Sequence, residues 1–166
     1  DYVAVYDATR GKLINSNVQM KSALDARIVA PGTPEEVYNL VYPASAVTSL
    51  DSKAVVEFPA VQNYTADAID KATQIYVGRS KEGKGEMYLL SSILGVTVTS
   101  TYADCKISSV TIKSKSLPLA GVATVDMNYE ERPVATLTKA KNSVQLLFAE
   151  PLVLANGESR TLYIAV

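Results

Sequence analysis

The sequence from residue 87 to residue 129 is a series of short segments in which apolar and polar side chains alternate. The alternation is clearest at 96–99, 110–113 and 125–129, where β-branched residues are frequent. A period of two residues with one apolar face is typical of a half-buried strand, because successive side chains of a strand point to opposite faces. Glycine, proline and aspartate separate the segments. This stretch therefore predicts several consecutive strands.

The rest of the chain follows the same pattern. Further strands are expected at 1–6, 37–42, 55–58, 61–64, 75–78, 133–138, 144–148 and 161–166. The whole chain then holds about ten to twelve short strands with turn residues between them and no convincing long helix. This pattern predicts an all-β sandwich over residues 1–166, with a lobe boundary between 100 and 121 as the alternative.

Three stretches depart from plain alternation. Apolar residues within 18–28 stand at roughly helical spacing, which fits either a short helix or a strand pair. These residues are Met20, Ala23, Leu24 and Ile28. One or two helical turns are expected from Thr65, a candidate N-cap, to Lys71. The strongest break is Pro31–Gly32–Thr33–Pro34, because two prolines and a glycine do not fit a continuous strand ladder.

The composition is that of an ordinary globular protein, with 48% hydrophobic and 20% charged residues in a chain of 166. The net charge of −1 gives no electrostatic reason to expect nucleic acid or anionic lipid as a partner. The densest basic cluster is Arg79, Lys81 and Lys84, and it is interrupted by Glu82 and Glu86. This cluster predicts a solvated turn.

The chain contains no histidine, which excludes catalytic triads that use one and most transition-metal sites. Its single cysteine, Cys105, cannot form an internal disulfide bond. A reactive thiol would need a general base, so Cys105 is interpreted as a small, partly buried residue beside the start of a strand. We therefore expect no catalytic residue, no cofactor and no enzymatic activity.

Acidic residues form three groups that are candidates for a catalytic or metal-binding site. The pairs Glu35–Glu36 and Glu130–Glu131 lie beside prolines, and neighbours on an extended chain point in opposite directions. They are interpreted as solvated turns rather than as glycosidase or calcium sites. Asp67, Asp70 and Asn63 supply oxygen ligands but lack the spacing of a calcium loop, so no metal site is expected.

Tyrosine is abundant, with ten residues against two phenylalanines and no tryptophan. A tyrosine on a strand packs its ring and keeps its hydroxyl in water, which also makes it a good anchor at an interface. One hypothesis is a partner-binding surface patch built from Tyr2, Tyr6, Tyr38 and Tyr42. The alternative is that these are ordinary tyrosines at the edge of a sandwich.

The ends of the chain suggest a processed piece of a longer protein. The sequence starts at Asp1 without an initiator methionine, and it stops inside the strand expected at 161–166. It has no run of 18 or more apolar residues, so no membrane-spanning helix is expected.

The order of several short motifs resembles the fimbrillin-like family. The motifs are YNLVYPA at 38–44, EFPAVQNY at 57–64, YLLSSILGVTVT at 88–99, ISSVTI at 107–112, LPLAGVATVD at 117–126 and LYIAV at 162–166. Together they span most of the chain, from about residue 37 to its end. Members of this family are surface lipoproteins and fimbrial subunits of anaerobic Gram-negative bacteria.

The resemblance implies a transthyretin-like antiparallel β-sandwich with short helical turns at most. It also implies export as a lipoprotein, trimming by a protease, and assembly by strand exchange with neighbouring subunits. In such β-augmentation, main-chain hydrogen bonds give affinity and alternate side chains give specificity. The sequence departs from the pattern because no lipid-modified cysteine stands at its start and no donor segment follows Val166.

From these observations we expect an extracytoplasmic, structural or adhesive subunit of a fimbria at the cell surface or outer membrane, with no chemical step. Its expected partners are other fimbrial subunits and ligands on host or bacterial surfaces, and a membrane only through a lipid anchor outside this chain. The alternative is a glycan-binding surface lipoprotein, although the lack of tryptophan weighs against it. An enzyme is the third hypothesis.

Overall fold

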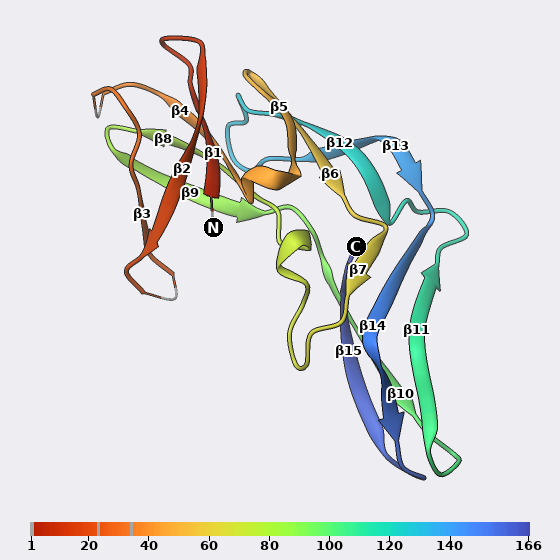
Figure 1. Ribbon diagram of the computed structural model, residues 1–166. Coiled ribbons are helices and arrows are strands. Elements are labelled where there is room, and N and C mark those ends of the chain that lie inside the picture. Colours follow the sequence, from red (N-terminus) through yellow and green to blue (C-terminus); the bar gives the residue numbers. More distant parts are fainter. Residues whose placement is uncertain (1, 23, 34) are drawn as a thin grey trace. The chain divides into compact units, whose positions relative to one another are not determined.

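The protein is all-β, as the alternating sequence predicts. The structure, a computed structural model, describes residues 2–22, 24–33 and 35–166, and within these ranges it has fifteen strands and two short 3₁₀ helices (Figure 1). Most strand pairs are antiparallel, and β7 (Val61–Asn63) runs parallel to β14 (Ser143–Leu154). No helix in the described ranges has the length and apolar character needed to cross a membrane.

The chain divides into two compact units, and each is made of three separate segments. Unit 1 comprises Asp1–Glu57, Ile75–Leu90 and Val122–Thr138. Unit 2 comprises Phe58–Gln74, Ser91–Gly121 and Lys139–Val166. The six segments alternate along the sequence, so the chain passes between the units five times. One passage follows Gly121, at the end of the range where a lobe boundary was expected.

Unit 1 contains a six-stranded sheet in the order β3-β2-β1-β4-β8-β9. Its strands are β3 (Ala26–Ile28), β2 (Lys12–Met20), β1 (Tyr2–Asp7), β4 (Tyr38–Tyr42), β8 (Tyr76–Lys81) and β9 (Lys84–Leu89). Val3, Val5, Tyr38 and Leu40 form a buried cluster on one face. Ala4, Val41 and Val77 are cross-strand partners on the other face and are also buried. The central strands are thus apolar on both faces.

A four-stranded sheet in the order β13-β12-β6-β5 lies largely within unit 1. Its strands are β13 (Ala135–Lys141), β12 (Ala120–Asp126), β6 (Lys53–Phe58) and β5 (Val47–Leu50), and the 3₁₀ helix η1 (Ala44–Ala46) precedes β5. Ala54, Val56, Ala123 and Val125 are fully buried. These residues alternate along β6 and β12, so each strand turns one apolar face to the core.

The β8–β9 hairpin closes through the two residues Glu82 and Gly83, because Lys81 pairs with Lys84. Both loop residues have positive φ, 56° and 72°. Two successive positive φ angles are the signature of a type I′ turn, whose twist matches that of the flanking strands. Gly83 adopts this conformation without strain because it has no side chain beyond its α-carbon.

Unit 2 contains a two-stranded sheet and a three-stranded sheet. β10 (Ile93–Thr99) pairs with β15 (Ser159–Ala165), and β11 (Cys105–Lys113) pairs with β14, which also pairs with β7. Residues from both sheets share one buried cluster, which comprises Ala120, Val144, Leu146, Phe148, Leu162 and Ile164. Two sheets that share a core form a sandwich.

Two local predictions were resolved or corrected by the structure. Of the stretch 18–28, residues 18–20 pair with residues 26–28 in the β2–β3 ladder, so the strand pair is the correct alternative. The helical turns expected at 65–71 are wrong: Thr65 forms an isolated bridge with Ala68, and the 3₁₀ helix η2 (Lys71–Thr73) begins later. Asp70, not Thr65, caps that helix, because its carboxylate accepts a hydrogen bond from the Ala72 N–H. The expectations placed on Asp1, Ala23 and Pro34 lie outside the described residues.

Candidate functional site

One face of the β8–β9 hairpin in unit 1 carries charged and aromatic side chains. Paired residues of an antiparallel ladder share a face, and this face contains the pairs Val77–Tyr88, Arg79–Glu86 and Lys81–Lys84. β9 is the last strand of the six-stranded sheet, so the hairpin lies at its edge. The sequence places these side chains together because they stand two residues apart on extended backbone.

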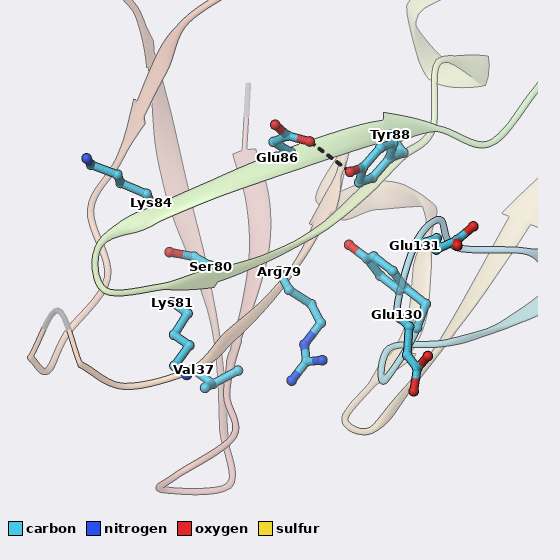
Figure 2. Close-up of a pocket in the computed structure, with 10 residues that line it drawn as sticks. Val37, Arg79, Ser80, Lys81, Lys84, Glu86, Tyr88, Glu130 and Glu131 are labelled. Atoms are coloured by element: carbon cyan, nitrogen blue, oxygen red, sulfur yellow. Dashed lines mark hydrogen bonds between the residues drawn. The ribbon is translucent and has the colours of Figure 1, made fainter.

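A groove of about 510 Å³ opens on this face. The hairpin contributes Arg79, Lys81, Lys84, Glu86 and Tyr88, and the segment after β12 contributes Tyr129, Glu130 and Glu131 (Figure 2). We call this feature the hairpin groove; Val37 and Ser80 complete its lining. Its volume falls within the range of small-molecule sites.

Tyr88 contacts two other residues of the groove, Glu86 and Tyr129, and also Arg132. Its hydroxyl donates a hydrogen bond to Glu86 Oε2 at 2.8 Å (Figure 2). Its ring meets that of Tyr129 edge to face, with 6.1 Å between centroids and 89° between planes. The guanidinium carbon of Arg132 lies 5.7 Å from the centre of the Tyr88 ring. Aromatic and cation–π contacts of this kind orient the rings.

Both groove tyrosines stay protonated near neutral pH. The hydrogen bond to Glu86 raises the pKa of Tyr88, and partial burial and the Glu86 charge act in the same direction. Burial also raises the pKa of Tyr129. The charge of Arg79 and a hydrogen bond with the Arg79 backbone lower this pKa, but the effect of burial is larger. The two phenols therefore present neutral hydroxyl groups rather than phenolates.

Arg79 has no anionic partner among the described residues, although Glu86 stands directly opposite it on β9. Glu86 instead accepts a hydrogen bond from the Tyr88 hydroxyl. The Nε of Arg79 is shielded from solvent and has no hydrogen-bond partner. The Nε of Arg160 is also shielded and unbonded, but the Nη2 of Arg160 forms a salt bridge with Glu158 Oε1 at 3.2 Å. Arg79 is therefore the least satisfied of these cations.

The structure does not bring the four predicted partner-binding tyrosines together. Tyr2 and Tyr6 share one face of the six-stranded sheet, because Tyr6 pairs with Asn39. Tyr38 and Tyr42 lie on the opposite face, with the Val5–Leu40 pair. Tyr2 is 55% exposed and Tyr38 only 7%. A role in partner binding stays a prediction, and it would involve separate surfaces.

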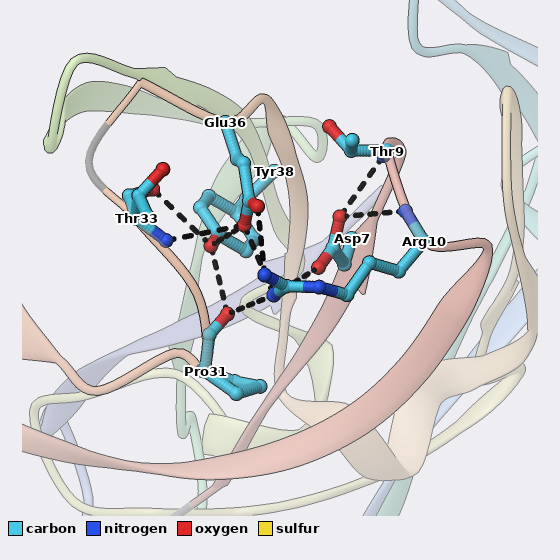
Figure 3. A network of polar contacts seen from close by, with 7 residues as sticks. All are labelled: Asp7, Thr9, Arg10, Pro31, Thr33, Glu36 and Tyr38. Atoms are coloured by element: carbon cyan, nitrogen blue, oxygen red, sulfur yellow. Dashed lines mark hydrogen bonds and ion pairs between the residues drawn. The ribbon is translucent and has the colours of Figure 1, made fainter.

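Tyr38 belongs to a polar network that joins residues 31–36 to the sheet (Figure 3). Its hydroxyl oxygen lies 2.7 Å from Glu36 Oε2 and 2.8 Å from the Pro31 carbonyl oxygen, so its single proton has two acceptors within hydrogen-bond distance. Arg10 bridges Glu36 at 2.9 Å and Asp7 at 3.1 Å. The interpretation of Glu36 as a solvated turn residue is therefore wrong, because its side chain is 15% exposed and bound on two sides. This network joins loop to strand.

The other acidic groups differ in their surroundings. Asp70 accepts hydrogen bonds from the backbone and side-chain amides of Asn63, at 2.8 and 3.2 Å. In the described part of the chain, no three acidic, cysteine or histidine side chains gather as metal ligands would. Glu130 and Glu131 are exposed and line the hairpin groove. Cys105 starts β11 and is partly buried, where a structural cysteine was expected.

A second candidate surface lies on the edges of unit 2. Ser92 and Val166 exchange both backbone hydrogen bonds at 2.8 Å, which sets the alternation of the β10–β15 ladder. The backbone groups that point away from the ladder are those of Ile93, Gly95, Thr97 and Thr99 on β10, and of Ser159, Thr161, Tyr163 and Ala165 on β15. Within the described residues only Ala165 has a partner there, the side chain of Gln62 at 2.7 and 3.0 Å.

Burial in unit 2 decreases from β15 and β14 toward β10 and β11. Leu162 and Ile164 are fully buried, whereas Leu94, opposite Ile164 on β10, is 38% exposed. Gln62 joins β7 to β15, so the outer edges of β10 and β11 both lie on the side of this sandwich that is away from Gln62. We call this side the β10–β11 seam. Its half-exposed apolar residues are Leu94, Val96, Val98, Ile107, Val110 and Ile112.

The hairpin groove was missed because its basic residues were interpreted as a solvated turn. The signal was present, since Arg79 and Lys81 stand two apart on one strand, as do Lys84 and Glu86 on the next. The groove also needs the segment 129–131, which lies far away in the sequence. No known family model matches the chain, and no curated protein or solved structure matches it either.

Proposed function

We propose that this chain is a structural or adhesive subunit of a bacterial cell-surface fimbria that assembles by β-strand exchange. The observation that carries the proposal is the β10–β11 seam. It combines a row of outward backbone groups with apolar side chains that are only half covered. An extended segment of another subunit would satisfy both, because a strand adds hydrogen bonds along its edge and side chains on one face.

β10 is the least protected edge of unit 2. Its seven residues, ILGVTVT, include no charged residue and no proline. β11 contains two lysines and a register shift between Ile107 and Ser109. β15 contains Arg160, and the side chain of Gln62 caps the backbone of its last residue. Charges, bulges and side-chain caps are the usual means of preventing edge-to-edge association. β10 has none of these, so it is the edge at which we place the incoming strand.

The incoming strand has a defined pattern in this proposal. Leu94, Val96 and Val98 face the core side of β10, so every second residue of the donor must be apolar to cover the seam. A donor of about seven residues matches the length of β10. The proposal carries with it a transthyretin-like sandwich, an extracytoplasmic location at the outer membrane, and a lipid anchor outside this chain.

The first test is self-association of the full-length, protease-trimmed protein, followed by SDS-resistant laddering on gels and by electron microscopy. Ladders and filaments are the expected result, since a strand with a complete set of main-chain bonds dissociates slowly. A trimmed protein that stays strictly monomeric at high concentration, alone and with its co-expressed subunits, would contradict assembly by strand exchange.

Hydrogen exchange then identifies the edge that is used. On assembly, the amides of Ile93, Gly95, Thr97 and Thr99 should become protected, because only these β10 amides point outward. The amides of Ser159, Thr161 and Tyr163 on β15 serve as the internal control and should continue to exchange. Protection of the β15 amides instead would keep strand exchange but overturn the assignment to the β10–β11 seam.

A further inference from the structure

We infer that the hairpin groove of unit 1 is a binding site for a sugar that carries a single carboxylate, with Arg79 as the residue that holds this carboxylate. The inference goes beyond the proposed strand exchange and does not depend on it, because all residues of the groove belong to unit 1 and the β10–β11 seam belongs to unit 2.

The inference starts from Arg79, whose Nε has no hydrogen-bond partner among the described residues. A shielded nitrogen that lacks a hydrogen bond is costly, and native proteins rarely leave such a group without an explanation. Two residues face Arg79 on the neighbouring strands. Glu86 on β9 is bound to Tyr88. Asn39 on β4 is neutral, and its buried Oδ1 also lacks a hydrogen bond among the described residues. A guanidinium forms two parallel hydrogen bonds with a carboxylate, so a ligand carboxylate would supply the hydrogen-bond acceptors that Arg79 lacks.

The charge of the groove limits the ligand to one negative charge. The lining contains three cations, Arg79, Lys81 and Lys84, and three carboxylates, Glu86, Glu130 and Glu131. These sum to zero, and Arg132 beside the Tyr88 ring adds one positive charge. An excess of one positive charge is too small to favour a polyanion. Arg79 and Lys81 extend from the same side of β8 (Figure 2), so the ligand carboxylate is placed on that side.

The remaining groups fit the neutral part of a sugar. Glu130 and Glu131 are exposed acceptors for hydroxyl protons, whereas they would repel a phosphate dianion. The Tyr129 ring, held by Tyr88, gives an apolar wall for the C–H face of a pyranose. The volume of about 510 Å³ admits one or two sugar rings. Carboxylate, hydroxyls and an apolar ring face are combined in a uronic acid.

The test compares two probes that differ only in the carboxylate, methyl β-D-glucuronide and methyl β-D-glucoside. Each is titrated into the full chain, with binding measured by calorimetry and by NMR shifts of the groove residues. We expect the glucuronide to bind at least about tenfold more tightly than the glucoside, and its affinity to decrease as salt is added. Shifts at the Arg79 Nε–H should accompany binding.

Variants assign the effect to Arg79. Arg79→Met should weaken glucuronide binding by at least about tenfold and leave glucoside binding unchanged. Arg27→Met is the matched control, since Arg27 is an exposed arginine on β3 of the same unit and its loss should change neither. If Arg79→Met unfolds the chain, Lys81→Met tests the same face at an exposed position and should reduce glucuronide affinity severalfold.

Several outcomes would overturn the inference. These are equal affinities for glucuronide and glucoside, unchanged glucuronide binding by Arg79→Met, and no binding of the glucuronide to the folded chain. Acetate, inorganic phosphate and an N-acetylated amino acid are titrated in parallel. If any of these binds as tightly as the glucuronide, the groove is a general anion site or a site for peptide carboxylates, and the assignment to a sugar is wrong.

Discussion

Gln62 is a buried amide whose two ends both bind the backbone of one residue in the last strand. Its Nε2 donates to the Ala165 carbonyl at 2.7 Å, and its Oε1 accepts the Ala165 N–H at 3.0 Å. A side chain thereby takes the place of a neighbouring strand at the end of β15. The contact spans 103 residues of sequence, so it also ties β7 to the end of the chain.

Replacing Gln62 by leucine should destabilise the protein by about 2–4 kcal/mol. The substitution keeps the volume but leaves the buried N–H and C=O of Ala165 without partners, which costs more than the loss of an exposed hydrogen bond. Urea unfolding measures the change. Gln19→Leu, at an exposed position on β2, is the control and should stay within about 0.5 kcal/mol of the wild type. Equal midpoints for both variants would contradict the role of Gln62.

Tyr38 makes the stability of unit 1 sensitive to alkaline pH. Burial, together with the hydrogen bond to Glu36 and its charge, raises the pKa of Tyr38 from 10.0 to about 12. The folded state therefore holds this proton more tightly than the unfolded state. The resulting stabilisation is fully present below pH 10, and it is lost as the pH rises toward 12.

Tyr38→Phe should make the loss of stability between pH 10 and 12 shallower than in the wild type, because the titrating group is gone. It should also lower stability at neutral pH, since Glu36 and the Pro31 carbonyl lose a donor. Denaturant midpoints measured across this pH range check both effects. Tyr102→Phe, at a ring that is 77% exposed, is the control and should follow the wild-type curve.

At the scale of elements, the two strands of the β10–β15 sheet differ in what lies on their outer edges. Thr97 and Thr161 are directly opposite each other, and their hydroxyl groups are 3.1 Å apart on the exposed face. Both backbone N–H groups point away from the shared ladder. The same substitution can therefore be made at Thr97 to alter the β10 edge or at Thr161 to alter the β15 edge.

Thr97→Pro should abolish laddering of the trimmed protein, while Thr161→Pro should leave it intact. Proline removes an N–H that only an incoming strand would use, and proline is tolerated at the solvent side of an edge strand. Circular dichroism should show that both variants retain the strand content of the wild type. If Thr161→Pro prevents laddering and Thr97→Pro does not, the donor strand binds β15 and the seam is misassigned.

At the scale of the whole molecule, the two units are interleaved in sequence. Neither unit is a continuous segment, and the four-stranded sheet takes β5 and β6 from before residue 60 and β12 and β13 from after residue 119. Apolar residues of β6, such as Val56, are buried only when β12 is present beside them. Folding of unit 1 therefore requires a late part of the chain.

A fragment that ends at Leu90 should fail to fold, although it includes all six strands of the larger sheet. It lacks β12 and β13, so the buried face of β6 would be open to water and the loss of apolar burial would exceed typical domain stability. Dispersed amide resonances and a cooperative unfolding transition in this fragment would show instead that the first sheet is independent. The 1–166 chain is the control.

Much of the fold followed from local pattern. The alternation at 96–99 and 110–113 correctly predicted parts of β10 and β11, and the apolar positions of 144–148 are the buried ones in β14. At 125–129 the prediction was only partly right, because β12 ends at Asp126 and residues 127–129 follow it outside any strand. The strand pair at 18–28 and the late start of η2 were less predictable, because a few residues at helical spacing carry little weight against tertiary contacts.

The sequence by itself determined that this protein is all-β, because side-chain alternation is a property of neighbouring residues and depends on no distant contact. It also excluded histidine chemistry by composition. Only the tertiary structure decided that β10 pairs with β15, that Gln62 closes one edge of unit 2, and that Arg79 has no carboxylate partner among the described residues. Each of these depends on segments far apart in sequence, and strands of the same alternating pattern can pair in many orders until a shared core selects one.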